Sequence, residues 1–315
     1  AAKAFPRMIV DKPSGLYDKV KTEDLNRDEM EKRGPNSTAA VSQVGYEQGT
    51  YSVPIESIAY ELNDTARKAA NVSRDPSKII PRVLALKANI RLERMLALKF
   101  MTLATHPWYR TITGGGSDSV SAGASSTRKY FNSTSTDLVK MVLDEASYMS
   151  DVAGQDPDAM LFSRDAWIAF RTNDSVLAAL TVAGVPVSRN RPATTAEVAA
   201  LLELSYVGVS KATYNSAPKG ITESNAKIVP DGTALLYVRG SEGDDPGEWN
   251  DEMPVAGACQ VWADGAGNRE GLRIRRFRNE MAGSGGSDRS EMDTFRDYGT
   301  VNAKMGTFFT GMVGS

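Results

Sequence analysis

The sequence has one cysteine, one histidine and almost no net charge, and each of these scarcities excludes a class of protein. With Cys259 alone, the chain has neither an intrachain disulfide framework nor an all-cysteine metal site, which suits a reducing compartment such as a cytoplasm. With His106 alone, it has no metal site or proton relay that needs two histidines. We therefore expect no metal and no cofactor.

Charge is balanced over the whole chain, with 37 Lys and Arg against 39 Asp and Glu. A chain so close to neutral has no overall field to draw in nucleic acid or an anionic membrane, so any basic surface must be local. The longest mostly apolar run, Val176 to Val187, is too short to span a bilayer and contains Gly184 and Pro186. We expect no membrane partner.

The chain does have enough apolar sequence for folded domains. At 315 residues and 41% hydrophobic residues, it predicts about two domains with real cores. The sequence starts at Ala1 with neither an initiator Met nor a signal segment, so we expect trimming of unknown extent.

The first 74 residues predict extended chain with little helix. FPRMIV, GLYDKV and TYSVPIESIAYEL have the composition of strands, while DKPSG and RGPNS are typical of turns. The charged segment KVKTEDLNRDEMEKRG predicts a solvated excursion rather than a packed layer. A core would be hard to build from this part of the chain.

A long helix is predicted from residue 75 to residue 103. Asp75 is a candidate N-cap and Pro76 suits the first helical position, while Pro81 still falls within the early turns. One apolar stripe at helical spacing contains Ile79, Val83, Leu86, Ile90, Ala97 and Met101, and four more apolar residues lie outside it, namely Leu84, Leu92, Met95 and Leu98. The helix predicts neighbours on more than one side, or else a core helix whose cations extend to solvent.

The remaining sequence predicts an α+β domain followed by late strands. Residues 111–131 are rich in Gly and Ser and predict a flexible loop. From 136 to about 260 the pattern predicts helices after Thr136, after Ser163 and near Thr194 or Thr195, with strands at AMLF, YVGVSKATY and TALLYV. CQVWAD, GLRIRRFRNEM and residues 290–313 predict further strands, and there is no internal repeat.

A search for catalytic motifs finds none in the context that its chemistry needs. GAGNREG, from Gly265 to Gly271, misses the dinucleotide-binding spacing and is better explained as a turn between strands. Ser126 and Lys129 have the spacing of a Ser/Lys acylase, but its companion motifs are absent. Asp144 and Glu145 are adjacent, so they point apart on a helix and predict solvated surface. We therefore predict that the chain is not an enzyme.

Two groups of cations remain as candidate contact sites. The first lies on the long helix and comprises Lys78, Arg82, Lys87, Arg91 and Arg94, and the second lies in LRIRRFR and comprises Arg273, Arg275, Arg276 and Arg278. On a strand, alternation divides the second group between two faces. Intersubunit ion pairs and a phosphate-binding patch therefore both stay open for it.

The order of these segments resembles the major capsid proteins of tailed bacteriophages, whose fold is shared with encapsulin nanocompartments and the floor of herpesvirus shells. The segments that carry the resemblance are FPRMIVDKPSGLYDKV, VGYEQGTYSVPIESIAYELNDTARKAA, the long helix, PDAMLFSRDAWIAFR, TTAEVAALLELSYVGVSKATYNSAPKG, TALLYV, LRIRRFRNE and residues 298–313. No single segment is specific, but their order and spacing extend over nearly the whole chain.

The resemblance implies an α+β fold with three parts. Residues 1–74 would form an N-terminal arm and extended loop, residues 75–135 and 261–315 the two halves of a peripheral domain with a spine helix and long strands, and residues 136–260 an axial domain. An extended loop that cannot bury its own apolar residues has to bury them on another copy. Its expected intersubunit contacts are Phe5, Met8, Ile9, Tyr17, Tyr46 and Tyr51.

The resemblance also implies a function. The chain would assemble with itself, as pentamers and hexamers, into an icosahedral head around packaged double-stranded DNA, with the helix cations in weak phosphate contact. A portal protein, a scaffold or protease, and a decoration protein would be further partners. The chain would be a structural, late protein of the virion, assembled in the host cytoplasm. An encapsulin-like shell around a cargo enzyme is the alternative, and an enzyme is the third class.

Overall fold

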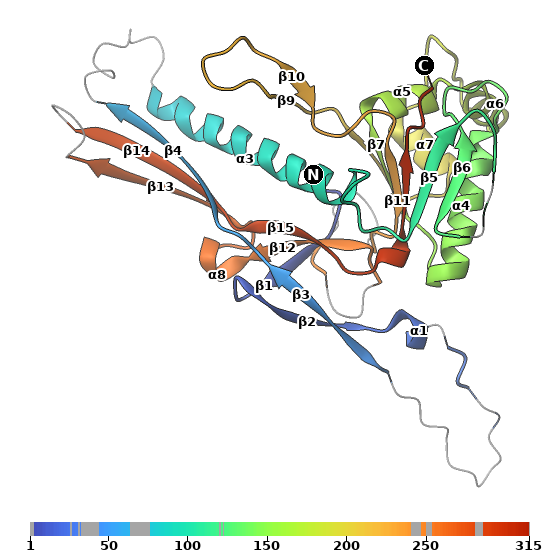
Figure 1. Cartoon of the computed structure of the whole chain (residues 1–315), viewed down its shortest axis with the longest axis horizontal. Helices are drawn as coiled ribbons and strands as arrows, with labels where there is room; N and C mark the ends of the chain where they lie inside the picture. The colour runs from blue at the N-terminus through green and yellow to red at the C-terminus, as the bar shows by residue number, and fades with distance from the viewer. Residues whose placement is uncertain are drawn as a thin grey trace.

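The computed structural model has an elongated part built around one long helix and a packed part built around a six-stranded sheet (Figure 1). It describes residues 3–25, 27–30, 32, 44–63, 76–119, 121, 123–240, 247–249, 254–280 and 286–314. Helices and strands both contribute throughout, so the fold is of the α+β class, as predicted.

The packed part has a mixed sheet with the strand order β6-β5-β16-β11-β7-β8. Its strands are β5 (Arg110–Gly115), β6 (Ser125–Lys129), β7 (Ala159–Ser163), β8 (Tyr206–Ser210), β11 (Ala234–Tyr237) and β16 (Gly306–Thr310). β7 and β11 are central and buried along their whole length. A strand buried on both faces has no polar side to alternate with, which explains the continuous apolar runs AMLF and ALLY.

Four helices pack around this sheet, namely α4 (Leu138–Ala153), α5 (Arg164–Arg171), α6 (Asp174–Val182) and α7 (Thr195–Leu201) (Figure 1). The predicted caps are confirmed, because Ser163 accepts a hydrogen bond from the Ala166 N–H and Thr194 forms a capping box with Glu197. Helix α6 is not among the predicted helices. Its sequence, DSVLAALTV, has too few polar residues after the first turn to show a helical period.

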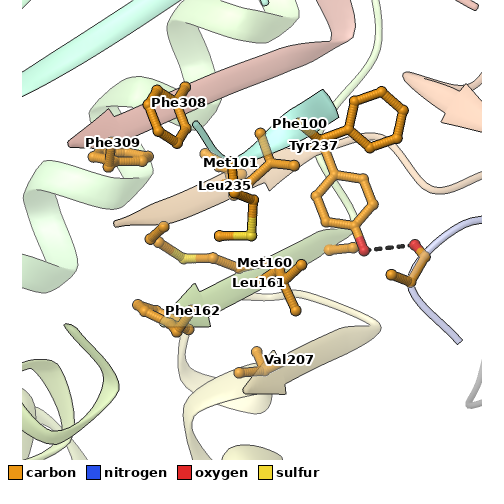
Figure 2. Close-up of a cluster of buried hydrophobic side chains, with 14 of the residues drawn as sticks. Phe100, Met101, Met160, Leu161, Phe162, Val207, Leu235, Tyr237, Phe308 and Phe309 are labelled. Atoms are coloured by element: carbon orange, nitrogen blue, oxygen red, sulfur yellow. Dashed lines mark hydrogen bonds between the residues drawn. The ribbon is translucent and has the colours of Figure 1, made fainter. Parts of the chain in front are cut away.

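The core between these elements is rich in aromatic and sulfur-containing side chains (Figure 2). Met160 and Phe162 of β7 project from one face of the sheet with Phe309 of β16, while Leu235 and Tyr237 of β11 project from the other face with Phe308 (Figure 2). All six are fully buried. Apolar burial on this scale is the main term that holds the sheet and its helices together.

The elongated part is organised by helix α3 (Pro76–Phe100), which confirms the predicted long helix (Figure 1). The candidate cap Asp75 lies outside the described residues. Below the helix is a three-stranded antiparallel sheet of order β13-β14-β4, whose strands are β4 (Glu56–Asn63), β13 (Leu272–Asn279) and β14 (Ser287–Thr294).

The face of α3 that packs on this sheet is not the predicted stripe. Ile80, Leu84 and Ala88 are buried against Leu62 and Met292. In the predicted stripe, Ile79, Val83 and Leu86 are exposed, while Ala97 and Met101 at the other end are buried in the main core. The predicted apolar residues do share one face of the helix, but the rest of the chain buries only those in the C-terminal half of that face.

A third sheet connects the two parts. It has the order β1-β12-β15, with β1 (Arg7–Val10) parallel to β12 (Gly257–Trp262), and β12 antiparallel to β15 (Arg296–Thr300). The short helix α8 (Ala263–Ala266) and the turn after it join β12 to β13, so GAGNREG is a connection between strands, as predicted. The 3₁₀ turn η1 (Ala303–Met305) leads from β15 into β16.

Two ribbons project from this body (Figure 1). The first pairs β2 (Ser14–Val20) with β3 (Tyr46–Ser52), and helix α1 (Thr22–Leu25) follows β2. The second pairs β9 (Thr213–Asn215) with β10 (Asn225–Lys227). Strands β1 to β4 confirm the extended structure predicted for the described residues of the first 74.

Strand pairing corrects two of the predicted domain boundaries. Residues 111–131 were expected to be a flexible loop of the peripheral domain, but they include most of β5 and all of β6. β16, placed by the sequence in the other peripheral half, lies between β5 and β11. All three strands belong to the sheet of the predicted axial domain. The composition of residues 111–131 concealed this, because Gly and Ser are depleted in ordinary strands.

A buried ion triad fastens this corner of the packed part and corrects the prediction of a solvated Glu145. The Glu145 carboxylate is fully buried and accepts hydrogen bonds from Arg110 Nε at 2.6 Å and Arg128 Nη2 at 2.8 Å. The Arg110 guanidinium also lies over the Tyr148 ring, 3.8 Å from its centroid. Because adjacent helical residues point apart, Asp144 faces solvent and pairs with Lys140.

We predict that Glu145→Gln lowers the free energy of unfolding by about 3–5 kcal/mol, because it leaves two buried guanidinium groups without a compensating charge. Asp144→Asn is the matched control, and its exposed pair is worth less than about 1 kcal/mol. Urea denaturation followed by circular dichroism measures both. Equal losses from the two variants would contradict the triad.

Candidate assembly interface

The β2–β3 ribbon is the first candidate surface, and its two faces differ. Side chains alternate along a strand, so Tyr17 and Lys19 share one face with Tyr51, while Leu16 shares the other with Tyr46. The first three are half-buried, whereas Leu16 and Tyr46 are each 60% exposed. The ribbon therefore has an inner face on its own subunit and an outer face in solvent.

The inner face is bound to the main chain of the subunit. The Tyr17 hydroxyl donates to the Thr300 carbonyl at 3.2 Å, and Lys19 Nζ donates to the Val301 carbonyl at 2.6 Å. The Tyr17 ring also meets Trp249 edge-on at 5.6 Å. Burial, with a smaller effect from the nearby Glu47, raises the pKa of Tyr17, so its hydroxyl stays a donor at neutral pH.

Two glycines let the aromatic rings lie flat across the ribbon. Gly49 is directly opposite Tyr17, and Gly15 is directly opposite Tyr51. A Cβ added at either glycine would fall against the ring of the opposing tyrosine. The glycines that weaken each strand are thus covered by the aromatic side chains of the other.

Two of the six predicted loop contacts, Phe5 and Met8, are buried within the chain itself, so they are not available to another copy. Phe5 has no exposed surface, and its ring lies 4.8 Å from that of Phe100 and 4.7 Å from that of Tyr237. Met8 is buried in a second apolar cluster, and Ile9 is half-buried against the main core. The sequence could not show this, because β1 is completed by β12, some 250 residues away.

The candidate cations of α3 do not form one surface. Arg91 is held by Glu56 of β4 through two hydrogen bonds, which contradicts its assignment to phosphate contact. The Arg94 guanidinium lies 4.2 Å from the centroid of the Tyr214 ring. Arg82 and Lys87 are exposed, and no carboxylate of the described chain pairs with them. The side chain of Lys78 lies outside the described residues.

Most of the cations of β13 form ion pairs with carboxylates of the same chain. Arg273 and Arg275 each lie 3.0 Å from the Asp293 carboxylate of β14, and Arg275 also lies 3.2 Å from Glu291. Arg278 lies 3.7 Å from Asp288, and Arg276 is opposite Ser290 in the strand register. These intrachain pairs account for most of the run LRIRRFR, which was predicted to serve intersubunit pairs or phosphate.

Asp293 is the centre of this ladder of charges. It is buried, and it accepts a hydrogen bond from Ser57 at 2.7 Å in addition to its two arginine partners. Burial by itself would raise the pKa of Asp293, but the Ser57 hydrogen bond and the two arginines outweigh it, and the net effect lowers the pKa. The carboxylate is therefore ionised at neutral pH and ties β13, β14 and β4 together.

No chemistry beyond packing and pairing is evident at the remaining candidate groups. Among the described residues, no cluster of His, Cys, Asp and Glu could hold a metal ion. Cys259 is buried, and burial raises its pKa to about 11, so its thiol is not a nucleophile at neutral pH. Burial lowers the pKa of His106, whose ring packs 4.6 Å from that of Phe308. A search of the described helices for one able to cross a membrane found none.

A cleft of about 740 Å³ lies beside the end of β2 and the helix α1 that follows it. Residues 19–23 line one side, the end of α4 at residues 152–154 lines another, and residues 300–305 lie between them. Val20, Val255 and Met305 are among its apolar lining residues. The α1 end of the ribbon is thus separated from the end of α4 by open space.

Solved structures share this fold over nearly the whole chain. A phage-related protein of Bordetella bronchiseptica is 17% identical, with a TM-score of 0.66 over 98% of this chain and 91% of that one. A chain of the cyanophage P-SCSP1u capsid is 10% identical, with a TM-score of 0.55 over 97% and 85%. A chain of an encapsulin complex of Synechococcus elongatus is 12% identical, with a TM-score of 0.50 over 98% and 85%. No family model and no curated protein matches the sequence.

We predict that Phe5→Ala lowers the free energy of unfolding by about 3–5 kcal/mol, because it removes a fully buried ring from the centre of an aromatic group. Tyr46→Ala is the control, since a mostly exposed ring contributes within about 0.5 kcal/mol. Urea titrations followed by tryptophan fluorescence compare them. A Phe5 variant as stable as the Tyr46 variant would show that Phe5 does not pack in its own subunit.

We also predict a loss of stability in acid that depends on Asp293. Its pKa is lower in the folded chain, so its contribution is present above the ordinary value of 3.8 and is lost as the pH falls through the folded value. Asp293→Asn should therefore destabilise the chain more at pH 7 than at pH 3. Urea midpoints at both pH values test this, and an equal loss at both would be inconsistent with a pairing of charges.

Proposed function

Because the chain has the major capsid fold that phage capsids share with encapsulins, we propose that it is the building block of a closed protein shell. One observation carries the proposal beyond the fold, which is the projecting β2–β3 ribbon (Figure 1). Its outer face exposes Leu16 and Tyr46. A two-stranded ribbon is marginally stable alone, and exposed apolar residues on it favour cover by another chain. A further copy of the same chain provides that cover.

The long helix supports the same conclusion. Ile79, Val83 and Leu86 continue, in solvent, the stripe that the subunit buries at Ala97 and Met101. Obligate interfaces between subunits bury about 2,000 Å² or more. The ribbon and the exposed stripe are separate surfaces, so one subunit can contact several neighbours, as closure of a symmetric shell requires.

More specifically, we propose that the shell is the head of a tailed phage, in which pentamers and hexamers close into an icosahedron around double-stranded DNA. A net charge of −2 keeps packaged DNA from adhering strongly to the wall. Of the predicted helix cations, Arg82 and Lys87 are exposed and suit weak, sequence-independent phosphate contact. A portal protein, a scaffold or protease, and a decoration protein are the other partners of such a head, which forms in the host cytoplasm.

An encapsulin-like compartment is the second candidate. The similarity to the encapsulin chain extends over 98% of this chain, so the fold itself does not separate the two functions. Such a shell would enclose a cargo protein in place of DNA. In both cases the chain acts through assembly, as a structural protein rather than an enzyme.

Electron microscopy of the purified full chain tests the shell, and the contents of the particles separate the two candidates. We expect hollow polyhedral particles, or rings of five and six subunits. Particles isolated from the native source should contain nuclease-protected DNA if the chain forms a phage head, and a co-purifying enzyme if it forms a compartment. A monomer or dimer under all assembly conditions would overturn the shell.

We predict that the double variant Leu16→Ser, Tyr46→Ser raises the protein concentration needed for assembly by at least about tenfold, because two exposed apolar side chains lose their burial on a neighbour. The stability of the subunit should change by less than about 1 kcal/mol, since both side chains are mostly exposed. Thr50→Ala, on the same outer face, is the control. Light scattering against concentration measures assembly, and an unchanged threshold would remove the outer face from the interface.

A further inference from the structure

The segment from Thr300 to Met305, here called the connector, joins two sheets. Thr300 ends β15 in the sheet β1-β12-β15, and Met305 precedes β16 in the six-stranded sheet. A change in the angle between these sheets would alter the backbone of the connector, because the connector joins β15 directly to β16. The connector is therefore a joint between the elongated part and the packed part.

Both parts hold the connector by its main chain. The Val301 N–H and the Asn302 N–H donate to the Ala256 carbonyl, immediately before β12, at 3.0 and 3.1 Å. From the packed part, the Tyr109 N–H donates to the Ala303 carbonyl at 2.9 Å, and Val238 N–H donates to the Met305 carbonyl at 3.0 Å. The connector thus responds to the position of each sheet.

The second half of β2 and the start of α1 bind this same segment through four side-chain contacts in sequence order. Tyr17 binds the Thr300 carbonyl, Lys19 binds the Val301 carbonyl, Thr22 Oγ1 accepts from Asn302 Nδ2 at 3.1 Å, and Glu23 lies 3.7 Å from Lys304. The Lys19 side chain is only 19% exposed, so its bond to the carbonyl is shielded from water.

Space for movement lies beside these contacts. The cleft of about 740 Å³ separates residues 19–23 from the end of α4, and the connector lines it. If the contacts to the connector opened, the α1 end of the ribbon could turn into this space without meeting the packed part. On the side of the cleft, these polar contacts hold the ribbon in its present direction, while on its inner face Tyr17 and Tyr51 also pack against the apolar cluster that contains Met8.

We propose that Tyr17, Lys19, Thr22 and Glu23 form a latch that couples the direction of the ribbon to the angle between the two sheets. The coupling is a mechanical property of the subunit, and its consequence rests on the proposed shell function. One chain in pentamers and hexamers has to occupy positions of different curvature. The latch makes the outer contact surface turn together with the packed part, which limits the set of curvatures that the subunit can adopt.

Hydrogen exchange on the unassembled full chain tests the coupling. In the double variant Tyr17→Phe, Lys19→Met, which keeps the ring and the aliphatic stem, we expect amide exchange to quicken about five- to tenfold in the ribbon and also in the connector peptide 300–306. Lys21→Met is the matched control, because Lys21 is exposed and forms no side-chain hydrogen bond or ion pair with the described residues. Faster exchange in the ribbon alone would overturn the latch.

The second measurement is the size distribution of assembled particles by analytical ultracentrifugation and electron microscopy. We expect the double variant to assemble into particles of several diameters, while the wild type and Lys21→Met give one. A single wild-type diameter for the double variant would refute control of curvature by the latch. Failure of the wild type to assemble would instead reject the proposed shell, and the exchange experiment would still decide whether ribbon and connector are coupled.

Discussion

The packing of four aromatic rings is the interaction on which the rest of the structure depends. Phe5 contacts Phe100 at the end of α3, Tyr237 of β11 and Tyr298 of β15, with ring centroids 4.7 to 6.2 Å apart. The Tyr237 hydroxyl also donates to the Ala4 carbonyl at 2.6 Å (Figure 2). The long helix, the sheet of the packed part and the connecting sheet therefore meet around one residue of the N-terminal segment.

This arrangement explains why a long, thin subunit can still be well defined. The elongated part has a small apolar cluster of its own beneath α3, centred on Leu84 and Met292, and otherwise relies on paired charges such as those around Asp293. Its other large apolar residues, such as Val83 and Leu86, are exposed. The apolar surfaces that hold the chain together are therefore distinct from those that stay exposed, and the two faces of the β2–β3 ribbon are the clearest case.

Short-range sequence patterns predicted most helices and strands correctly, but they did not predict which distant residues each one packs against. The caps at Ser163 and Thr194 and the length of α3 follow from short-range patterns, and all three are confirmed. The burial of Phe5 and Glu145 could not be predicted, because it depends on partners at Tyr237 and Arg110 that are distant in sequence. The stripe on α3 misled for a related reason, since periodicity shows which residues share a face but not which chain covers it.

The position of β16 has a consequence for how the subunit is made. β16 comes last in sequence among the six strands of its sheet, yet it lies between β5 and β11. Until it is synthesised, β5 and β6 have no strand to pair them with the rest of the sheet, and Phe308 and Phe309 are missing from the core. A chain that stops early would therefore expose apolar surface to chaperones and proteases, which would degrade it before it accumulates.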